Sequence, residues 1–454
     1  MSELAIKDTD ARKRLVSLFD DGVFTEIDAF AKSSNGDVEV VAGFGTVNGA
    51  PVYAFSQDVS VNGGAVSVAQ CAKIKKIYDL ASKTGCPVVG IYDSNGMDLK
   101  EGFEGLSAYG EIVKASTSVS GVVPQISIVA GAAVGTTALI ADMADVVVAV
   151  KDADFYVTAP SEVTAEACAQ EGTVDILADD FDSAVKAVRD IITLVPSNNL
   201  STPPVYDFTD PAAGTPEPPV YFLRSPAPPA DTGACAADII KAAADEGSVI
   251  ELKEKYAENC ITALATVAGS TVGFVGFDGK SVCPSCAYKA EAFVKFCDAF
   301  NIPIVTLLSA NGLRKERENQ MLIAAAKLTA AYATATCPKI SVITGKAVGA
   351  AYIMLAGRGS NADLVYAWDT SVVSPLDTKA AVAFLYNDRL ANGENRAELE
   401  KEYEENLASP FTAAACGAID DVFVPAETRA KIVAALDVLA GKRETTLPRK
   451  HSVK

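Results

Sequence analysis

The sequence contains a single histidine, His451, in the tail RKHSVK. This near-absence argues against chemistry that depends on imidazole, namely a Ser-His-Asp or Cys-His nucleophile, a histidine general base and a histidine-ligated zinc ion. Any reaction must therefore use backbone donors, other side chains or a base that arrives with the substrate. We expect no metal site in this chain.

Positive charge is also scarce, since 39 lysines and arginines stand against 58 acidic residues and the formal net charge is −19. No basic stripe is available to neutralise phosphates, so we expect no general nucleic-acid binding.

Long apolar runs are missing as well. The longest uncharged stretch, residues 115–141, contains Pro124, Gln125 and seven serines or threonines, which indicates buried core rather than a membrane span. The first residues, MSELAIKDTDARKR, contain no apolar signal region. Ten dispersed cysteines without an export signal are typical of reduced thiols, so we expect a cytoplasmic protein.

Residues 121–150 combine an apolar strand at 126–129, a glycine turn and a second apolar strand at 146–150. A helix is predicted to begin after Gly135, at Thr136, so its first N–H groups have no intrahelical acceptor. Small residues let a ligand approach such donors, which suit a developing oxyanion. Glycine and alanine are equally typical of close helix–sheet packing, so both interpretations stay open.

The first half of the chain reads as alternating helices and strands. Residues 48–49, Asn-Gly, predict a two-stranded hairpin. A helix over 67–84 precedes a strand over 87–92. That strand runs into the turn DSNG at 93–96, at the C-terminal end of a strand where α/β ligand sites commonly lie. A helix near 106–115 follows.

The second half repeats this order. The segment from PVYAFSQ to DSNG has its counterpart in TVGFVGFDGKSVCPSCAYKAEAFVKFCDAFNIPIVTLLSANG, and GAAVGTTALIA has its counterpart in GKAVGAAYIML. Matches in the same order, offset by roughly 215 residues, indicate two copies of one α/β domain. We expect these domains at 1–195 and 231–454, joined by a proline-rich linker at 196–230.

Specific segments extend over nearly the whole chain, among them ARKRLVSLFDDGVFTEIDAF, YAFSQDVSVNGGAVS, LVPSNNL, FCDAFNIPIVT and CPKISVITGKAVGAAY. In this order they resemble the carboxyltransferase subunits of biotin-dependent acyl-CoA carboxylases and decarboxylases. That family includes propionyl-CoA carboxylase beta chains and the alpha chains of methylmalonyl-CoA and glutaconyl-CoA decarboxylases. The resemblance implies two tandem crotonase-like α/β domains of ββα repeats. It also implies an active site where the first domain of one subunit meets the second domain of another.

The resemblance accounts for the missing histidine, because in the family the ureido group of biotin acts as the base after carboxybiotin releases carbon dioxide. Backbone N–H pairs stabilise the two enolates. The resemblance implies Gly135 and Thr136 for the acyl-CoA, and Ala350 and Ala351 beside Gly349 for biotin. It further places Gly63, Gly64, Ser94, Asn95 and Gly96 on the acyl-CoA side. Ile353 implies an apolar acyl chain, with a place in the core as its alternative role.

The implied partners follow from the same resemblance. No Met-Lys biotin-attachment motif is present, so biotin is expected on a separate biotin carboxyl carrier protein. A biotin carboxylase partner implies carboxylation of the acyl-CoA, whereas a membrane decarboxylase subunit of a sodium pump implies decarboxylation. The family analogy suggests a homo-oligomer, with a hexamer as the expected form.

Several positions depart from the family pattern. Threonine stands at 136 where a second glycine is usual, Gly349-Ala350-Ala351 replaces Gly-Gly-Ala, and the turn at 93–98, DSNGMD, lacks an expected arginine. Two alternatives therefore stay open: a hydratase or isomerase of the broader crotonase type, and a catalytically silent scaffold for a larger complex.

Two further motifs have competing interpretations. Cys283-Pro284-Ser285-Cys286 is a C-x-x-C, which suits a redox pair or half a zinc site. Without a second pair at ligand spacing, the sequence favours two structural thiols. The run RKERE at 314–318 is interpreted as a solvated helix face, with contact to CoA phosphates as the alternative.

Overall fold

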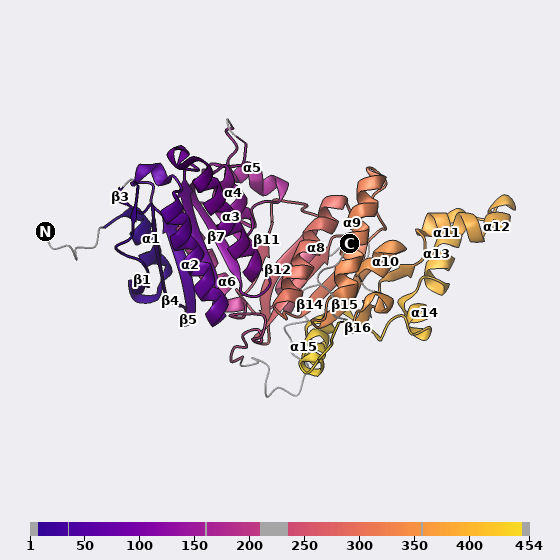
Figure 1. Cartoon of the computed structure of the whole chain (residues 1–454). Coiled ribbons are helices and arrows are strands. Elements are labelled where there is room, and N and C mark those ends of the chain that lie inside the picture. The colour runs from indigo at the N-terminus through magenta and orange to yellow at the C-terminus, as the bar shows by residue number, and fades with distance from the viewer. Residues whose placement is uncertain (1–7, 35, 159–160, 209–234, 356, 447–454) are drawn as a thin grey trace. The chain divides into compact units, whose positions relative to one another are not determined.

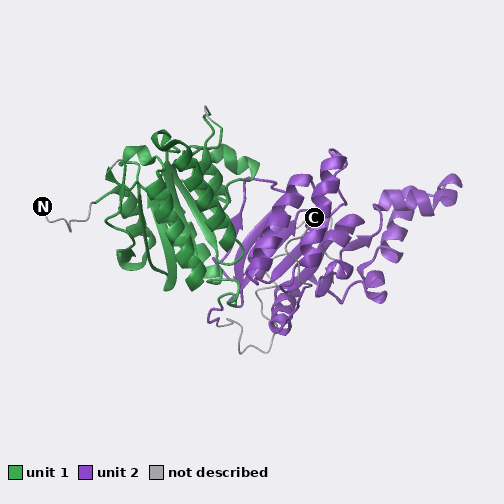
Figure 2. Ribbon diagram, viewed as in Figure 1, with its two compact units in different colours: residues 1–204 green, residues 205–454 purple. Residues whose placement is uncertain are grey.

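The computed structural model describes residues 8–34, 36–158, 161–208, 235–355 and 357–446. They form two compact units that divide between Pro204 and Val205, coloured green and purple in Figure 2. The boundaries 1–195, 196–230 and 231–454 stay a prediction. Most of the expected linker lies outside the described residues, as does His451.

The first unit is a twisted sheet covered by helices (Figure 1). Its strands are β1 (Phe24–Glu26), β4 (Val40–Val47), β5 (Ala50–Gln57), β6 (Val88–Ser94), β7 (Gln125–Val134), β8 (Val146–Val150), β9 (Phe155–Tyr156) and β10 (Ile176–Ala178), beside a small sheet of β2 (Lys32–Ser33) and β3 (Gly36–Asp37). Its helices are α1 (Asp10–Leu18), α2 (Val68–Thr84), α3 (Gly102–Val119), α4 (Thr136–Asp142), α5 (Ala165–Glu171) and α6 (Phe181–Leu194). The order is β1-β4-β5-β6-β7-β8-β10, with β9 paired to β7. Pairs β1–β4 and β4–β5 are antiparallel, and the pairs from β5 onward are parallel.

The second unit has the same topology, β11-β12-β13-β14-β15-β16-β18, with β17 paired to β15. Its strands are β11 (Ile250–Leu252), β12 (Cys260–Val267), β13 (Ser270–Phe277), β14 (Ile304–Ala310), β15 (Lys339–Val348), β16 (Leu364–Trp368), β17 (Val372–Ser374) and β18 (Asp421–Phe423). Its helices are α7 (Ala236–Ala243), α8 (Pro284–Ala299), α9 (Glu318–Thr334), α10 (Ala350–Leu355), α11 (Thr378–Leu385), α12 (Asn387–Ala391), α13 (Arg396–Asn406), α14 (Pro410–Ala415) and α15 (Thr428–Leu439). Helices α11 to α14 lie between β17 and β18, where the first unit has only α5, and residues of α11 and α13 form a small separate core there.

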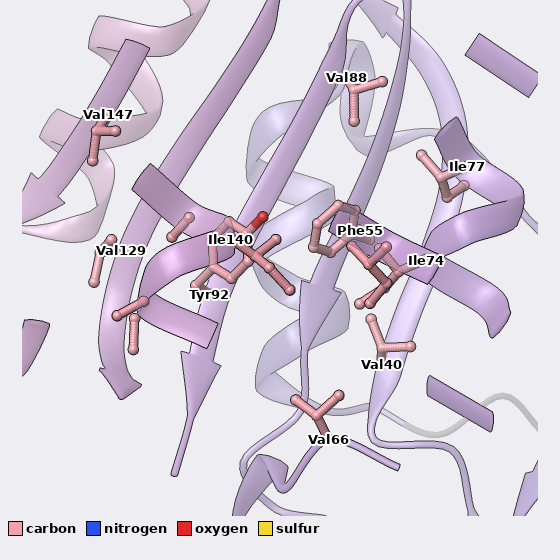
Figure 3. Packing of buried hydrophobic residues seen from close by; sticks show 14 of the residues in the cluster. Val40, Phe55, Val66, Ile74, Ile77, Val88, Tyr92, Val129, Ile140 and Val147 are labelled. Carbon is pink, nitrogen blue, oxygen red and sulfur yellow. The ribbon is translucent and has the colours of Figure 1, made fainter. Parts of the chain in front are cut away.

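Along each strand of the first unit, side chains alternate between the two faces of the sheet, so core residues lie on both faces. Figure 3 shows the rings of Phe55 and Tyr92 beside Ile74 and Ile140 on the face covered by α2, α3 and α4. The two ring centroids are 5.5 Å apart and the ring planes are nearly perpendicular, an edge-to-face contact. Helices α1 and α6, which contact each other, cover the opposite face of the sheet.

Most element predictions around the glycine turn are confirmed. The predicted helix at 67–84 is α2, capped by the Ser67 hydroxyl and ended by Gly85 in the left-handed region. The predicted helix at 106–115 is longer at both ends in α3. The prediction that the strand ends at residue 129 is wrong, since β7 continues to Val134. The longer strand depends on a tertiary contact, since the end of β7 pairs with β9.

One charged cluster occurs in both units. Asp20 accepts hydrogen bonds from the two amides of the Asn48-Gly49 hairpin, each at 2.9 Å, and from Arg189 at 2.7 Å. In the second unit Asp245 accepts from the corresponding hairpin amides and from Arg429. Each arginine also donates to the last turn of the first helix of its unit. This shared geometry supports the duplication independently of the sequence.

Arg189→Met is expected to lower the free energy of unfolding of the first unit by about 2 kcal/mol, because it leaves a half-buried carboxylate and the Leu18 carbonyl without their partner. Burial acts to raise the pKa of Asp20, but hydrogen bonds from the Gly49 amide, Arg189 and the Asn48 amide lower it to about 2. The stabilisation is therefore present above the ordinary carboxyl pKa near 3.8 and is lost as the pH falls toward 2.

Urea unfolding between pH 7 and pH 3 checks this expectation. Lys186→Met is the matched control, since Lys186 is an exposed residue of the same helix and its pair with Asp190 is an exposed i,i+4 contact. It should change the unfolding free energy by less than about 0.5 kcal/mol. Equal effects of the two variants would contradict a structural role for Arg189.

Candidate active site

Each unit ends its longest strand at a glycine with positive φ. Gly135 follows β7 with φ 63° and ψ −135°, and Gly349 follows β15 with φ 56°. The Gly135 N–H donates to the Tyr156 carbonyl at 2.9 Å, and the Gly349 N–H donates to the Ser374 carbonyl at 2.8 Å. Glycine adopts this backbone conformation without steric cost, so it allows the chain to turn directly from strand into helix.

The amides that follow each glycine are open donors. Among the described residues, none accepts a hydrogen bond from the N–H of Thr136, Thr137, Ala350 or Ala351. They are free because the first N–H groups of a helix have no carbonyl one turn before them. Gly135 is different, since its N–H is already donated. The predicted acyl-CoA pair, Gly135 and Thr136, stays a prediction, and in the repeat Thr136 and Thr137 are the residues that match Ala350 and Ala351.

A side-chain contact fixes the start of α4. The hydroxyls of Tyr109 and Thr137 are 2.9 Å apart, and both residues are buried. Burial raises the pKa of Tyr109, so its hydroxyl stays protonated at neutral pH. The Thr137 side chain is thereby held in the core.

Two more segments reach the same edge of the first sheet. The Asn95 N–H donates to the Gly63 carbonyl at 3.3 Å. Gly64 packs so closely that a Cβ there would lie 2.5 Å from the carbonyl oxygen of Asp93. A Cβ on Gly96 would lie 3.6 Å from the last residue of β7. The structure thus brings together Gly63, Gly64, Ser94, Asn95, Gly96, Gly135 and Thr136.

A half-buried ion pair lies directly behind this turn. Arg14 of α1 donates to Asp93 Oδ2 at 2.7 Å, and the Ala132 amide donates to Asp93 Oδ1 at 3.2 Å. Asp93 is 7% exposed. The pair joins α1, the end of β6 and β7, and so holds the Ser94–Gly96 turn against the next strand. The sequence analysis missed Arg14, because nothing local connects it to a residue 79 positions away.

The second unit builds the corresponding edge without this pair. Ser309 replaces Asp93, and a Cβ on Gly345 would lie 2.3 Å from the Ser309 hydroxyl, as one on Gly131 would lie 2.3 Å from Asp93 Oδ1. Ile353 of α10 is 56% exposed. Its alternative role in the core is therefore wrong.

Neither a metal site nor a membrane span is found in the part of the chain that the structure describes. There, no three His, Cys, Asp or Glu side chains are grouped so that they could hold a metal ion. The described helices likewise include none that is both long and apolar enough to cross a bilayer.

The family model of the carboxyl transferase domain matches residues 8–453. This chain belongs to the carboxyltransferase family. It is 35% identical to the propionyl-CoA carboxylase beta chain of Saccharopolyspora erythraea, over 97% of this chain and 89% of that protein. It is also 35% identical to the methylmalonyl-CoA decarboxylase subunit alpha of Veillonella parvula, over 97% and 92% of the two chains.

A solved structure extends this family assignment to the fold. The transcarboxylase 12S hexamer with bound methylmalonyl-coenzyme A matches with a TM-score of 0.90 and 33% identity, over 98% of this chain and 92% of that one. The crotonase-like fold class inferred from the sequence is confirmed by this match.

Proposed function

We propose that this chain moves a carboxyl group between carboxybiotin on a separate carrier protein and an acyl-CoA. The observation that supports this most directly is the repeated turn, in which a glycine with positive φ precedes two open amides in each unit. Two such donor pairs suit a reaction that develops negative charge on two different oxygens.

The chain's own residues supply binding and electrostatic stabilisation. The Thr136 and Thr137 amides stabilise the thioester oxygen of the acyl-CoA as its alpha carbon loses a proton. The Ala350 and Ala351 amides stabilise the ureido oxygen, and the tight fit behind Gly349, where a Cβ would lie 3.1 Å from the Pro375 carbonyl, keeps that turn in place. Biotin, when bound, supplies the carboxyl group and the base.

The threonine at 136 does not remove the proposed donor. A backbone N–H is independent of the side chain if φ and ψ are kept, and Gly135 retains the positive φ that the turn needs. This observation favours an active enzyme over a silent scaffold.

The relatives support the wider proposal. Propionyl-CoA carboxylase and methylmalonyl-CoA decarboxylase subunits are similar along nearly the whole chain, and the transcarboxylase 12S structure is a hexamer. We therefore propose that the chain forms a homo-oligomer, with a hexamer as the proposed form. This oligomer works with a biotin carboxyl carrier protein. Its second partner is a biotin carboxylase or a membrane decarboxylase subunit, and the direction of transfer depends on which one is present. Ile353 is assigned to the acyl-CoA side of this site. So is the sheet edge formed by Gly63, Gly64, Ser94, Asn95 and Gly96, which we call the acyl-CoA edge.

The first experiment is calorimetry of the full chain with acetyl-, propionyl-, methylmalonyl- and glutaconyl-CoA. It is followed by isotope exchange between the bound ester and carboxybiotin. Selective binding with exchange supports carboxyl transfer and identifies the acyl chain. Binding without exchange favours the scaffold, and turnover of an enoyl-CoA favours a hydratase or isomerase. No binding at millimolar ester overturns the proposal.

A further inference from the structure

A cavity of about 540 Å³ lies at the N-terminus of α8, entirely within the second unit. Its size is in the range of pockets that hold small ligands. None of its lining residues belongs to the Gly349 turn or to the predicted acyl-CoA edge. The lining residues are Tyr256, Cys283, Pro284, Ser285, Tyr288, Arg314, Glu316, Arg317 and Gln320.

Two cysteines begin the helix at this cavity. Cys283 is the N-cap of α8, and its Sγ accepts the Cys286 amide at 3.1 Å. Cys283 lines the cavity, whereas Cys286 is 1% exposed behind it. Both thiols are free. A thiol that lines a cavity, with a second and more deeply buried thiol one helical turn later, is the arrangement that C-x-x-C exchange sites use.

The surroundings separate the two thiols chemically. A hydrogen bond from the Cys286 thiol lowers the pKa of Cys283 to about 6, helped by backbone amides and by Arg314, and burial opposes this effect. The same hydrogen bond and burial raise the pKa of Cys286. Cys283 is thus the more acidic of the two thiols, and Cys286 is the less acidic one. Two arginines, Arg314 and Arg317, line the cavity with Glu316, which lies 3.8 Å from the Arg314 guanidinium.

The equivalent helix of the first unit shows that capping alone does not require this dithiol. There the N-cap is Ser67, whose hydroxyl accepts the Gln70 amide at 3.1 Å, so serine and glutamine occupy the positions of Cys283 and Cys286. A hydroxyl satisfies the same orphan donor. The two sulfurs therefore add reactivity that the fold itself does not need.

The run at 314–318 is exposed, as predicted, but most of it is not part of a helix. Helix α9 begins only at Glu318, so residues 314–317 are a loop. Arg314 and Arg317 of that loop line the cavity, and the start of the loop pairs with the residue before the α8 N-cap: a bridge joins Val282 and Leu313, and the Arg314 amide donates to the Val282 carbonyl.

We propose that Cys283 and Cys286 form a thiol–disulfide exchange site for a small disulfide that carries carboxylates. The Cys283 thiolate attacks one sulfur of the disulfide, forms a mixed disulfide and releases one thiolate. Cys286 then loses its proton and attacks Cys283 Sγ, which forms the Cys283–Cys286 disulfide and releases the second thiolate. The external disulfide is reduced to two thiols and the protein dithiol is oxidised.

The test treats the reduced full chain with glutathione disulfide at pH 7 and identifies the products by peptide mass spectrometry. Wild type should form the Cys283–Cys286 disulfide. Cys286→Ser should stop at glutathione bound to Cys283, and Cys283→Ser should leave Cys286 reduced. Because Ser67 provides the same cap in the first unit, both variants are expected to fold, and circular dichroism checks this.

Two further measurements sharpen the result. Alkylation of Cys283 should follow a titration that lies below the ordinary thiol pKa of 9.0. Arg314→Gln should slow the reaction with glutathione disulfide roughly fivefold but leave the reaction with neutral hydroxyethyl disulfide unchanged.

The proposal is overturned if the folded Cys286→Ser variant gives no mixed disulfide, or if the wild-type disulfide joins another pair such as Cys260 and Cys286. Equal slowing of both disulfides by Arg314→Gln overturns the preference for a carboxylate-bearing partner. These readouts do not depend on carboxyl transfer, so they stand or fall separately from the proposed function.

Discussion

Thr136→Pro is expected to lower the turnover of carboxyl transfer roughly 100- to 1,000-fold while the protein stays folded. Thr136 is the first residue of α4, and proline is tolerated at this helix position because the N–H there has no intrahelical acceptor. The substitution therefore removes one proposed oxyanion donor and little else. Isotope exchange between the acyl-CoA and carboxybiotin measures the loss.

Thr136→Ala is the matched control, since it shortens the side chain and keeps the N–H. It should retain activity within a fewfold range, and both variants should melt within a few degrees of wild type. Near-equal activity of the proline and alanine variants would show that this amide does not stabilise the reaction. Ala350→Pro is the same test on the biotin side, and it should reduce exchange without weakening acyl-CoA binding.

Much of this fold could be predicted because its signals are local. Asn48-Gly49 specifies a hairpin through its positive φ values, and the structure has one there, with φ 48° and 80°. The Ser67 cap and the Gly85 stop bound α2 for similar reasons. The duplication was visible because each signal recurs in the same order. The turn at Gly135 followed from the same reasoning, and its repeat at Gly349 confirmed the pattern.

The remaining features depend on contacts between residues far apart in the sequence. The last residues of β7 are a strand because β9 and Ser94 of β6 pair with them, and β9 also accepts the Gly135 N–H. No local pattern shows that this amide donates to Tyr156, so the sequence alone named Gly135 among the donors. The sequence favoured structural thiols for the C-x-x-C because it offers no second pair at ligand spacing, and it could not show the cavity, because Tyr256 and the loop at 314–317 line it from other parts of the chain.

The ion pair behind the acyl-CoA edge should have the largest effect on stability. Arg14→Met removes the cationic partner of Asp93, which is 7% exposed, and among the described residues it leaves the Ala132 amide as the donor to the carboxylate oxygens. Leaving such a charge uncompensated is expected to cost about 3 to 5 kcal/mol of unfolding free energy. Because Asp93 is followed directly by the turn at Ser94, acyl-CoA binding should weaken as well. Denaturant unfolding and calorimetry measure the two effects.

The second unit offers the means to separate charge from packing. At the positions of Arg14 and Asp93 it has Ile239 and Ser309, and both it and the first unit place a glycine of the next strand against that side chain. The double variant Arg14→Ile/Asp93→Ser should therefore recover most of the stability that Arg14→Met loses, since replacing both partners of a buried pair is far less costly than removing one. If the double variant is as unstable as Arg14→Met, the loss comes from the packing of the arginine side chain. If stability returns but acyl-CoA binding does not, the function of the Arg14–Asp93 ion pair is to position the Ser94–Gly96 turn.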